Sequence, residues 1–316
     1  HLCIGSEGIL GVITEVVVQV HHKPEKEDWY GWLFPDFKSG LDAIHECHRG
    51  DCMPTVTRLN DPKKTALSFA FKHPKTGIKD KIAKAFKWYI GNVKKIDFNQ
   101  CCLMVVKYEG TPQAFNRIKN RVTAIYKKHR GVCLGAEPGR SFAKVKFDFP
   151  HLRDYVMDRS IMADVSETAT TWDNLRTLHE SGLADVEQAI KDTGVDAWVG
   201  CHLSHSYRTG ASLYFTFGCL QREGREIEQY LYVKKAAEDA FMKNGGTLSH
   251  HHAVGTEHLP WVEEDLSPTG LKAVKALKAG LDPNDIMNPG KIIPSEKPLD
   301  DWGLSAEAID EFQSRS

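Results

Sequence analysis

The stretch WYGWLFPDFKSGLDAIHECHRGDCMPTVTRL, residues 29–59, decides the fold class. Residues 29–34 predict a strand that stops at a proline. Helical spacing then relates Phe37, Leu41, Ile44 and His48, and Gly50 ends the helix. Residues 53–59 return as a second strand. The stretch therefore predicts a β-α-β unit.

A second unit of the same kind follows, with a strand at 100–108, a helix at 112–130 and a short strand at 131–135. Further strands are expected at 160–168, 196–206 and 211–217, and helices at 149–158, 172–192, 223–243 and 267–279. This order predicts an α+β protein in which an antiparallel-sheet domain precedes a helical C-terminal region.

The last of these helices carries clear signals. Ser267 is expected to cap it and Pro268 to occupy its first turn. Its basic residues are expected to face solvent, namely Lys272, Lys275 and Lys278.

Composition excludes several classes of protein. The 41 basic and 42 acidic side chains give a net charge of -1, so no global field attracts nucleic acid or a membrane. The apolar runs are too short to cross a bilayer. Eight scattered cysteines without a CxxC pair predict reduced, mostly buried thiols in an intracellular protein and no disulfide scaffold.

A glycine turn, GSEGILG at residues 5–11, precedes a β-branched run that predicts a strand at 12–20. Glycines allow a tight backbone to approach a phosphate group or the edge of a cofactor. The spacing fits neither GxGxxG nor the P-loop, and a glycine turn without a ligand is at least as common.

The run Ser249-His250-His251-His252 follows Gly245 and Gly246 and therefore lies in a loop. Acid/base chemistry or anion binding is favoured over metal binding, because no carboxylate stands at a telling spacing. Polar loop histidines without a role remain the alternative.

Residues 211–217 alternate between polar and apolar, so Tyr214 lies on the polar face of a strand and is not needed as core filling. A tyrosine there either serves chemistry or forms a hydrogen bond at the sheet surface. Arg58 and Arg153 offer planar donor groups for a carboxylate or a phosphate, although surface arginines are common.

Taken together, the motifs resemble those of the alkyldihydroxyacetonephosphate synthase family over nearly the whole chain. This family is a branch of the vanillyl-alcohol-oxidase, or PCMH, type of FAD-linked oxidases. The order of the motifs carries the resemblance: GSEGILGVITEV, RLND at Arg58, LRD at Arg153, ETATTWD, SLYFTF at Tyr214, NGGTLSHHHAVG and LDPNDIMNPGK. SHHHAVG and DPNDIMNPGK are the most specific. Members that oxidise D-lactate or glycolate tend to carry a different histidine motif.

The resemblance implies FAD as the cofactor, no metal, and a role for each matching residue. It assigns the FAD-contacting turn to Ser6, Glu7, Gly8, Ile9, Leu10, Gly11 and Val12. Tyr214 resembles the catalytic tyrosine, and Arg153 and Arg58 resemble substrate-binding arginines. The essential histidine cluster corresponds to His250, His251 and His252. Residues 1–22 would end a FAD-binding domain, 23–245 would form the substrate-binding cap domain, and 246–316 a helical region that returns to the flavin.

The implied reaction exchanges the acyl group of acyl-dihydroxyacetone phosphate for a fatty alcohol, with Tyr214 as acid/base partner and a flavin ring nitrogen holding the substrate carbon. An FAD-linked oxidoreductase of a 2-hydroxy acid or alcohol is the alternative. In a third hypothesis the chain is a folded substrate-binding domain without turnover.

The sequence reads as a C-terminal fragment that lacks most of the FAD domain, and we expect it to bind FAD weakly or not at all. The lysine-rich segment 72–95 either lies on a membrane that supplies the lipid substrates or is a solvated helix. A homodimer without nucleic acid is expected. The resemblance implies a cytoplasmic location in a bacterium and a peroxisomal one in a eukaryote.

Overall fold

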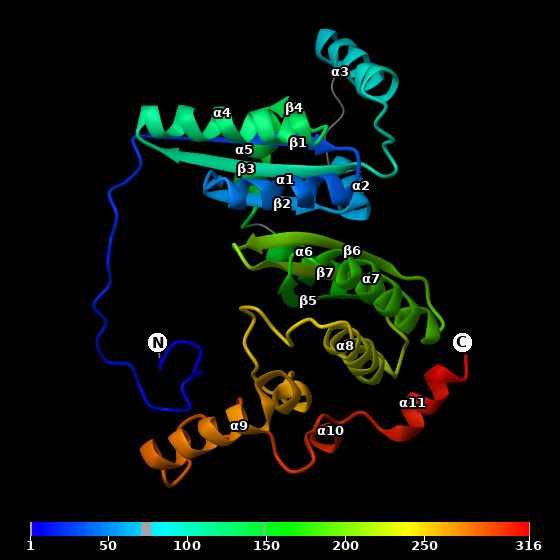
Figure 1. The fold of residues 1–316 in the computed structure, drawn as a ribbon. Helices are drawn as coiled ribbons and strands as arrows, with labels where there is room; N and C mark the ends of the chain where they lie inside the picture. Colours follow the sequence, from blue (N-terminus) through cyan, green and yellow to red (C-terminus); the bar gives the residue numbers. More distant parts are fainter. Residues whose placement is uncertain (1, 71–76, 148, 316) are drawn as a thin grey trace. The chain divides into compact units, whose positions relative to one another are not determined.

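The computed structural model describes residues 2–70, 77–147 and 149–315 and confirms the α+β class (Figure 1). Its strands are β1 Lys26–Phe34, β2 Val56–Asn60, β3 Cys102–Gly110, β4 Val132–Gly135, β5 Ile161–Thr171, β6 Trp198–Ser206 and β7 Gly210–Leu220. They form a sheet in the order β4-β1-β3-β2-β6-β7-β5.

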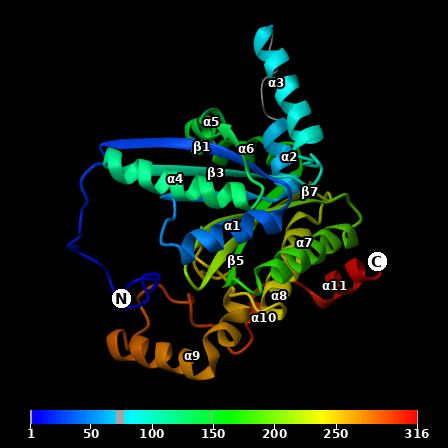
Figure 2. The same ribbon diagram turned by 45° about the horizontal axis from the view of Figure 1, so that its top comes forward.

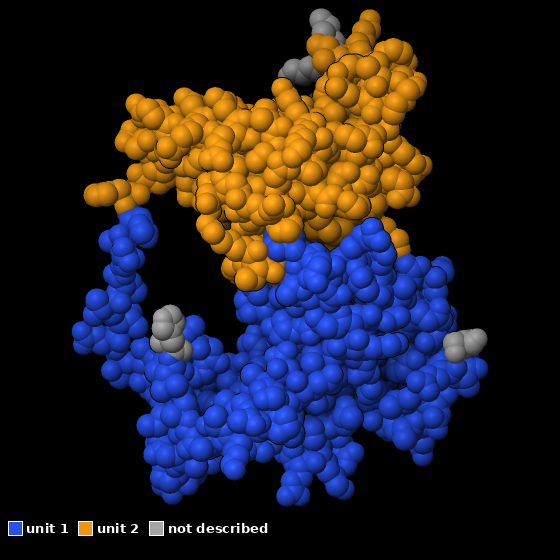
Figure 3. Space-filling model, viewed as in Figure 1, with its two compact units in different colours: residues 1–21, 156–199, 216–316 blue, residues 22–155, 200–215 orange. Residues whose placement is uncertain are grey.

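The longer helices are α1 Phe37–Arg49, α2 Pro62–Ala70, α3 Ile78–Trp88, α4 Pro112–Lys128, α5 Glu137–Val145, α6 Phe149–Met157, α7 Leu175–Asp192, α8 Glu226–Lys243 and α9 Val262–Leu281. Shorter ones are η1 Tyr89–Val93, η2 Leu259–Trp261, α10 Pro298–Asp301 and α11 Ala306–Gln313. The chain divides into two compact units (Figure 3). Unit 1 comprises residues 1–21, 156–199 and 216–316, and unit 2 comprises 22–155 and 200–215. The three-domain division expected from the resemblance stays a prediction.

Unit 2 is built from the two β-α-β units that the sequence predicts. Strand β3 lies between β1 and β2 and runs antiparallel to both, and β4 pairs antiparallel with the other edge of β1. The second unit is thus interleaved with the first, as in split β-α-β folds. Asp36 begins α1 by accepting a 2.7 Å hydrogen bond from the Ser39 amide, and Gly50 ends it.

Successive side chains of β1 point to opposite faces of the sheet, and a helix covers each face, α4 on one and α5 on the other. Trp32 and Phe34 place their rings 5.2 and 5.5 Å from the ring of Tyr126 in α4, which lies beside α1 (Figure 2). On the opposite face Gly31 meets Pro138 of α5, a helix that the sequence did not predict. A Cβ on Gly31 would lie 2.7 Å from Pro138, so this approach requires glycine.

In unit 1 the predicted start of the last helix marks a kink inside α9. Ser267 has a φ of 68° and accepts a 3.3 Å hydrogen bond from the Gly270 amide, as a capping residue would. The expectation that Lys278 faces solvent is wrong. Lys278 is buried because the following loop folds back over it, where it donates to the Met287 carbonyl at 2.6 Å and pairs with Asp282 and Asp285.

The strand expected at residues 12–20 is also wrong. In the described part of the chain these residues form no strand, and their large apolar side chains are exposed, Val17 at 95 %. A β-branched run favours a sheet only where another strand is available to pair with it.

All eight cysteines are free, and all except Cys3 and Cys133 are buried, as the sequence predicted. Among the described residues no helix combines the length and apolarity needed to cross a membrane. Lys72 and Lys75 of the lysine-rich segment lie outside the described residues.

Candidate active site

The RLND motif, residues 58–61, joins β2 to the start of α2 and thereby positions Arg58 and Lys64 in unit 2. Strand β2 ends in this motif, and Asp61 caps α2 by accepting the Lys64 amide at 2.7 Å. Its second carboxylate oxygen accepts the Cys201 amide of β6 at 2.6 Å. Asp61 thereby fixes the start of α2 against β6, which brings Lys64 close to Arg58.

Four side chains of unit 2 form what we call the Tyr214 cluster: Arg58, Lys64, His202 and Tyr214. Lys64 Nζ lies 2.7 Å from His202 Nδ1, and Arg58 Nη2 lies 3.5 Å from the same nitrogen. The His202 and Tyr214 ring centroids are 4.8 Å apart, and Lys64 Nζ lies 5.2 Å from the centre of the tyrosine ring. Lys64 and His202 are buried, whereas Arg58 and Tyr214 are half-buried.

Burial lowers the pKa values of the basic side chains in this cluster. It lowers the pKa of Arg58 to about 10. Burial, with the neighbouring charge of Arg58, lowers the pKa of Lys64 to about 7. Burial, with Arg58 and Lys64, holds the pKa of His202 well below its usual range, so this imidazole is neutral at pH 7 and its Nδ1 can accept a hydrogen bond from Lys64.

In unit 1 the histidine run, His250 to His252, faces the carboxylate of Glu167 on β5, whose side chain is 0 % exposed. His251 Nδ1 lies 2.7 Å from this carboxylate, His250 Nδ1 3.6 Å and His252 Nε2 3.8 Å. The His251 amide also donates to Glu167 at 3.3 Å. Burial lowers the pKa of His252, and the charge of Glu167 opposes this shift. Glu167 thus contacts all three imidazoles of the run.

The glycine turn holds the loop that follows the histidine run. The amides of Val254 and Gly255 donate to the Glu7 carboxylate at 2.7 and 2.8 Å, and the Asn288 side chain donates to the Glu7 carbonyl. The turn, the histidine loop and the loop at Asn288 therefore contact one another within unit 1. Sequence motifs from three distant parts of the chain meet there.

A buried ionic network on α8 supports the same loop. His258 Nδ1 contacts the Val254 carbonyl at 3.1 Å, and its Nε2 lies 3.5 Å from Glu238, whose side chain is 0 % exposed. Although burial acts against the charged imidazolium, the hydrogen bond and charge of Glu238 outweigh it and raise the pKa of His258. Lys234, also buried, pairs with Glu257 at 2.7 Å.

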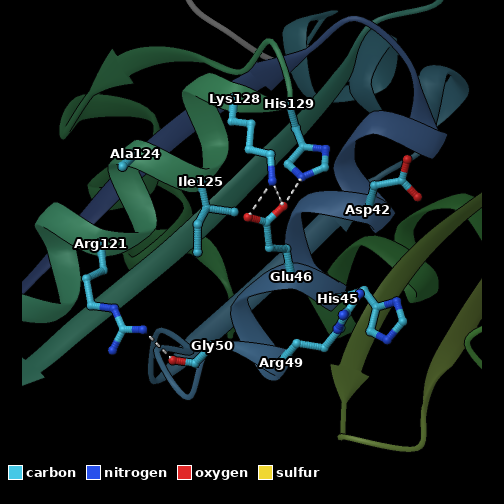
Figure 4. A pocket seen from close by; sticks show the side chains of 10 residues that line it. All are labelled: Asp42, His45, Glu46, Arg49, Gly50, Arg121, Ala124, Ile125, Lys128 and His129. Carbon is cyan, nitrogen blue, oxygen red and sulfur yellow. Dashed lines mark hydrogen bonds and ion pairs between the residues drawn. The ribbon is translucent and has the colours of Figure 1, made fainter.

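A surface pocket of about 760 Å³ lies between α1 and α4 in unit 2 (Figure 4). Lys128 and His129 contact the Glu46 carboxylate there at 2.8 and 2.7 Å, and Arg121 donates to the Gly50 carbonyl at 2.8 Å. These basic groups neutralise a carboxylate and the ends of two helices. The pocket contains no residue predicted to act in catalysis.

The structure brings some of the predicted site residues together within each unit. Arg58 and Tyr214 share one cluster, while the glycine turn and the histidine run share another set of contacts. Arg153 is exposed on α6, and its substrate-binding role stays a prediction. Lys64, His202 and Glu167 were not singled out from the sequence. Two of them lie in or near motifs that carry the resemblance, because Glu167 begins ETATTWD and Lys64 lies three residues after RLND.

Comparisons with known proteins identify the family of the chain. The family described as FAD linked oxidases, C-terminal domain, matches residues 23–292. The chain belongs to this family. An alkyldihydroxyacetonephosphate synthase of Dictyostelium discoideum is 37 % identical over 94 % of the chain and 49 % of its own length. An alkyldihydroxyacetonephosphate synthase of Trypanosoma brucei brucei is 36 % identical over 92 % of the chain and 48 % of its own length.

A solved alkyldihydroxyacetonephosphate synthase structure has a TM-score of 0.72 at 34 % identity, covering 90 % of this chain and 48 % of that one. The chain thus spans about half the length of these relatives. FAD is the cofactor of this family of enzymes.

The residues of unit 1 fit one edge of FAD. Gly5 and Gly11 have φ values of 80° and 154°, and a Cβ on either would meet no atom within 4 Å. The backbone of the turn is therefore open to close approach. Next to the histidine run, the buried Ser249 Oγ has no hydrogen-bond partner among the described residues. Residues 6–12 and Ser249 would hold a polar cofactor edge.

Proposed function

We propose that the protein is an FAD-dependent synthase that exchanges the acyl group of acyl-dihydroxyacetone phosphate for a fatty alcohol. The Tyr214 cluster carries this proposal, because a tyrosine surrounded by Arg58, Lys64 and His202 is suited to acid/base work on an anionic substrate. Relatives named as such synthases over almost the entire chain support it.

In this function Tyr214 takes a proton from the substrate and returns it after the exchange. A phenol has an ordinary pKa of about 10, and nearby cations favour its deprotonated form. Lys64 and Arg58 provide such cations at the ring. The bond between the dihydroxyacetone carbon and the ester oxygen breaks, so the fatty acid leaves as a carboxylate with both of its oxygens. The alcohol oxygen forms the ether bond to that carbon, and the alcohol proton is released.

The histidine run and Glu167 together form a second set of proton-binding side chains, within unit 1. Glu167 lies 2.7 Å from Nδ1 of His251 and thereby fixes the orientation of that imidazole. Bound FAD would supply a ring system that accepts and returns electron density, which no side chain offers. Residues 6–12 would position its edge.

The decisive experiment incubates the full-length, flavin-loaded protein with acyl-dihydroxyacetone phosphate and an oxygen-18-labelled long-chain alcohol. We expect an ether product that retains the label, measured by mass spectrometry. Absence of the ether, with reduction of the flavin by a 2-hydroxy acid, would establish an oxidoreductase instead. Ligand binding without either reaction would indicate a binding domain.

We further propose that α3 and η1 contact an anionic membrane that supplies the lipid substrates. Ile82 and Trp88 are exposed at 63 % and 62 %, and lysines surround them. An exposed amphipathic helix of this kind inserts its apolar side chains between headgroups while lysines pair with anionic lipids. The homodimer and the cellular compartment stay predictions.

Replacing Trp88 with alanine is expected to weaken binding to vesicles of phosphatidylcholine and phosphatidylserine by about tenfold, because a buried aromatic side chain contributes a few kcal/mol. Cosedimentation measures the binding. Ile227→Ala on α8, where Ile227 is 74 % exposed, serves as control and should bind like the wild type. Equal binding of W88A and the wild type would refute membrane contact by α3.

A further inference from the structure

Val254, in the loop that follows the histidine run, is held from two sides. Its amide donates to the Glu7 carboxylate at 2.7 Å, and its carbonyl accepts the His258 amide at 3.1 Å. The residue before it, Ala253, has a φ of 75°, which residues other than glycine rarely adopt. The contacts at Val254 therefore maintain a turn that Ala253 does not favour by itself, directly after His252.

The ring of His258 adds a further contact to this carbonyl. Its Nδ1 lies 3.1 Å from the Val254 oxygen, and its Nε2 lies 3.5 Å from Glu238 and 3.8 Å from Glu257. A carbonyl and a carboxylate only accept hydrogen bonds, so both ring nitrogens face acceptors. A neutral imidazole donates from one nitrogen, whereas the imidazolium donates from both. The geometry therefore favours the protonated ring.

Glu238 compensates this charge inside the protein. His258 is 6 % exposed and Glu238 is 0 % exposed. Beyond this ion pair, neither carboxylate oxygen of Glu238 has a hydrogen-bond partner among the described residues. Burial raises the pKa of Glu238, and the neighbouring His258 opposes that shift. Each group thus depends on the other to stay charged.

Helix α8 connects this ion pair to the strand that carries Glu167. Lys234 of α8 is 2 % exposed and donates to the Val165 carbonyl and to Ser166 Oγ, both at 2.9 Å. Val165 and Ser166 directly precede Glu167 on β5. The same helix therefore holds the strand of Glu167 and, through His258, the loop that follows the histidines.

Charge in this network also acts on the histidine run. Burial is the largest cause that lowers the pKa of His252, and Glu167 opposes it. Positive charge on His251, Lys234 and His258 acts in the same direction as burial. The charge of His258 is therefore coupled to the run electrostatically as well as through the backbone.

We propose that His258 is a positioning residue for the histidine run. Its imidazolium, held by Glu238, fixes the Val254 carbonyl and thereby keeps the run against Glu167. This role deepens the proposed function and rests on it for the reaction that the run serves. The coupling between His258 and the loop depends only on contacts within unit 1.

The order of the loop should depend on pH through His258. The titratable groups around its ring are, on α8, Glu238 and Lys234, in the loop, Glu257 and His252, and on β5, Asp164, which pairs with Lys234. The pKa of His258 is raised above its ordinary value of about 6.5, so the contribution of the imidazolium is present below 6.5 and is lost as the pH rises through the raised pKa. The loop should therefore be most ordered between the pKa of Glu238 and that of His258.

Hydrogen–deuterium exchange of residues 249–255 in the full-length flavin-loaded protein tests this dependence. Rates measured between about pH 5 and pH 9 are divided by the intrinsic rate at each pH, so that only protection by the fold remains. We expect loop exchange to rise about ten- to a hundredfold above the pKa of His258, the effect of losing one hydrogen bond to a charged group. Loop protection that stays constant over this range would overturn the proposal.

Glu238→Gln provides an independent measure. It keeps the volume but removes the charge that raises the pKa of His258, so the rise in loop exchange should move to lower pH. Near neutral pH, kcat for the ether product should fall about tenfold or more, because the run is less well placed. Glu46→Gln removes the carboxylate of another histidine ion pair, with His129 in unit 2, and should change neither quantity.

His258→Gln completes the set. Its amide can donate to the Val254 carbonyl but does not titrate, so the dependence of loop exchange on pH should disappear. E238Q with the wild-type exchange profile, E238Q with the wild-type kcat, or H258Q that retains the pH dependence would each contradict the positioning role. Loop exchange that follows these expectations in a protein without synthase activity would refute only the proposed function.

Discussion

Replacing Tyr214 with phenylalanine is expected to lower kcat of the exchange reaction by about 10²–10⁴-fold, the usual contribution of a positioned acid/base group. Phenylalanine keeps the ring that packs 4.8 Å from His202 and 5.2 Å from Lys64 Nζ, and it removes only the hydroxyl. The fold should therefore persist. Loss of one hydroxyl should change the free energy of unfolding by about 0.5–1.5 kcal/mol.

The measurement combines the ether-product assay with thermal unfolding of the full-length protein. Tyr207→Phe, in the turn between β6 and β7, is the matched control, because Tyr207 is 49 % exposed and lies outside the Tyr214 cluster. Its activity should equal that of the wild type. An unchanged kcat in Y214F would remove Tyr214 from the reaction.

Replacing Glu167 with alanine is expected to lower kcat by about 10²–10⁴-fold, because the histidine run loses the carboxylate that orients it. A hydrogen bond to a buried charged group contributes about 1.5–3 kcal/mol, so the free energy of unfolding should fall by about 2–3 kcal/mol. Glu167→Gln keeps the volume and should be the more stable variant. The difference in kcat between E167A and E167Q separates the effect of orienting the histidines from the effect of the negative charge.

The charge of Glu167 can be measured directly. It acts to raise the pKa of His252, against the burial that lowers it, so E167Q should lower this pKa further. Proton NMR of the histidine rings during a pH titration reports the shift. Glu264→Gln, at an exposed position of α9, should leave it unchanged. A His252 pKa that stays constant in E167Q would show that the carboxylate does not act on the imidazole.

Most of the fold could be predicted from local patterns. Alternation and helical spacing were sufficient for β1, α1 and β2, since each side chain there packs on the face that its position indicates. Local patterns did not show which strands become neighbours, and β3 lies between β1 and β2. They failed at residues 12–20, because strand formation depends on a pairing partner, and at Lys278, because the loop that buries it follows nine residues later.

The candidate site could be predicted only in part, for the same physical reason. Tyr214 and the histidines were found through motifs that are contiguous in sequence. Lys64 and His202 are 138 residues apart, and Glu167 and His251 are 84 apart, so their proximity arises from the fold. RLND followed by a proline was a usable signal for a capped helix, and a capped helix would have placed Lys64 near Arg58.

The hydrogen bonds of Glu7 also bear on the order in which the chain folds. They join residues 247 and 248 positions apart in sequence. Each doubling of a closed loop costs about 0.6 kcal/mol of chain entropy, so contacts this remote form only after the intervening segments are compact. The glycine turn should consequently dock last and detach first. Its amides should exchange with solvent deuterium through local opening, long before those of β1 and β3.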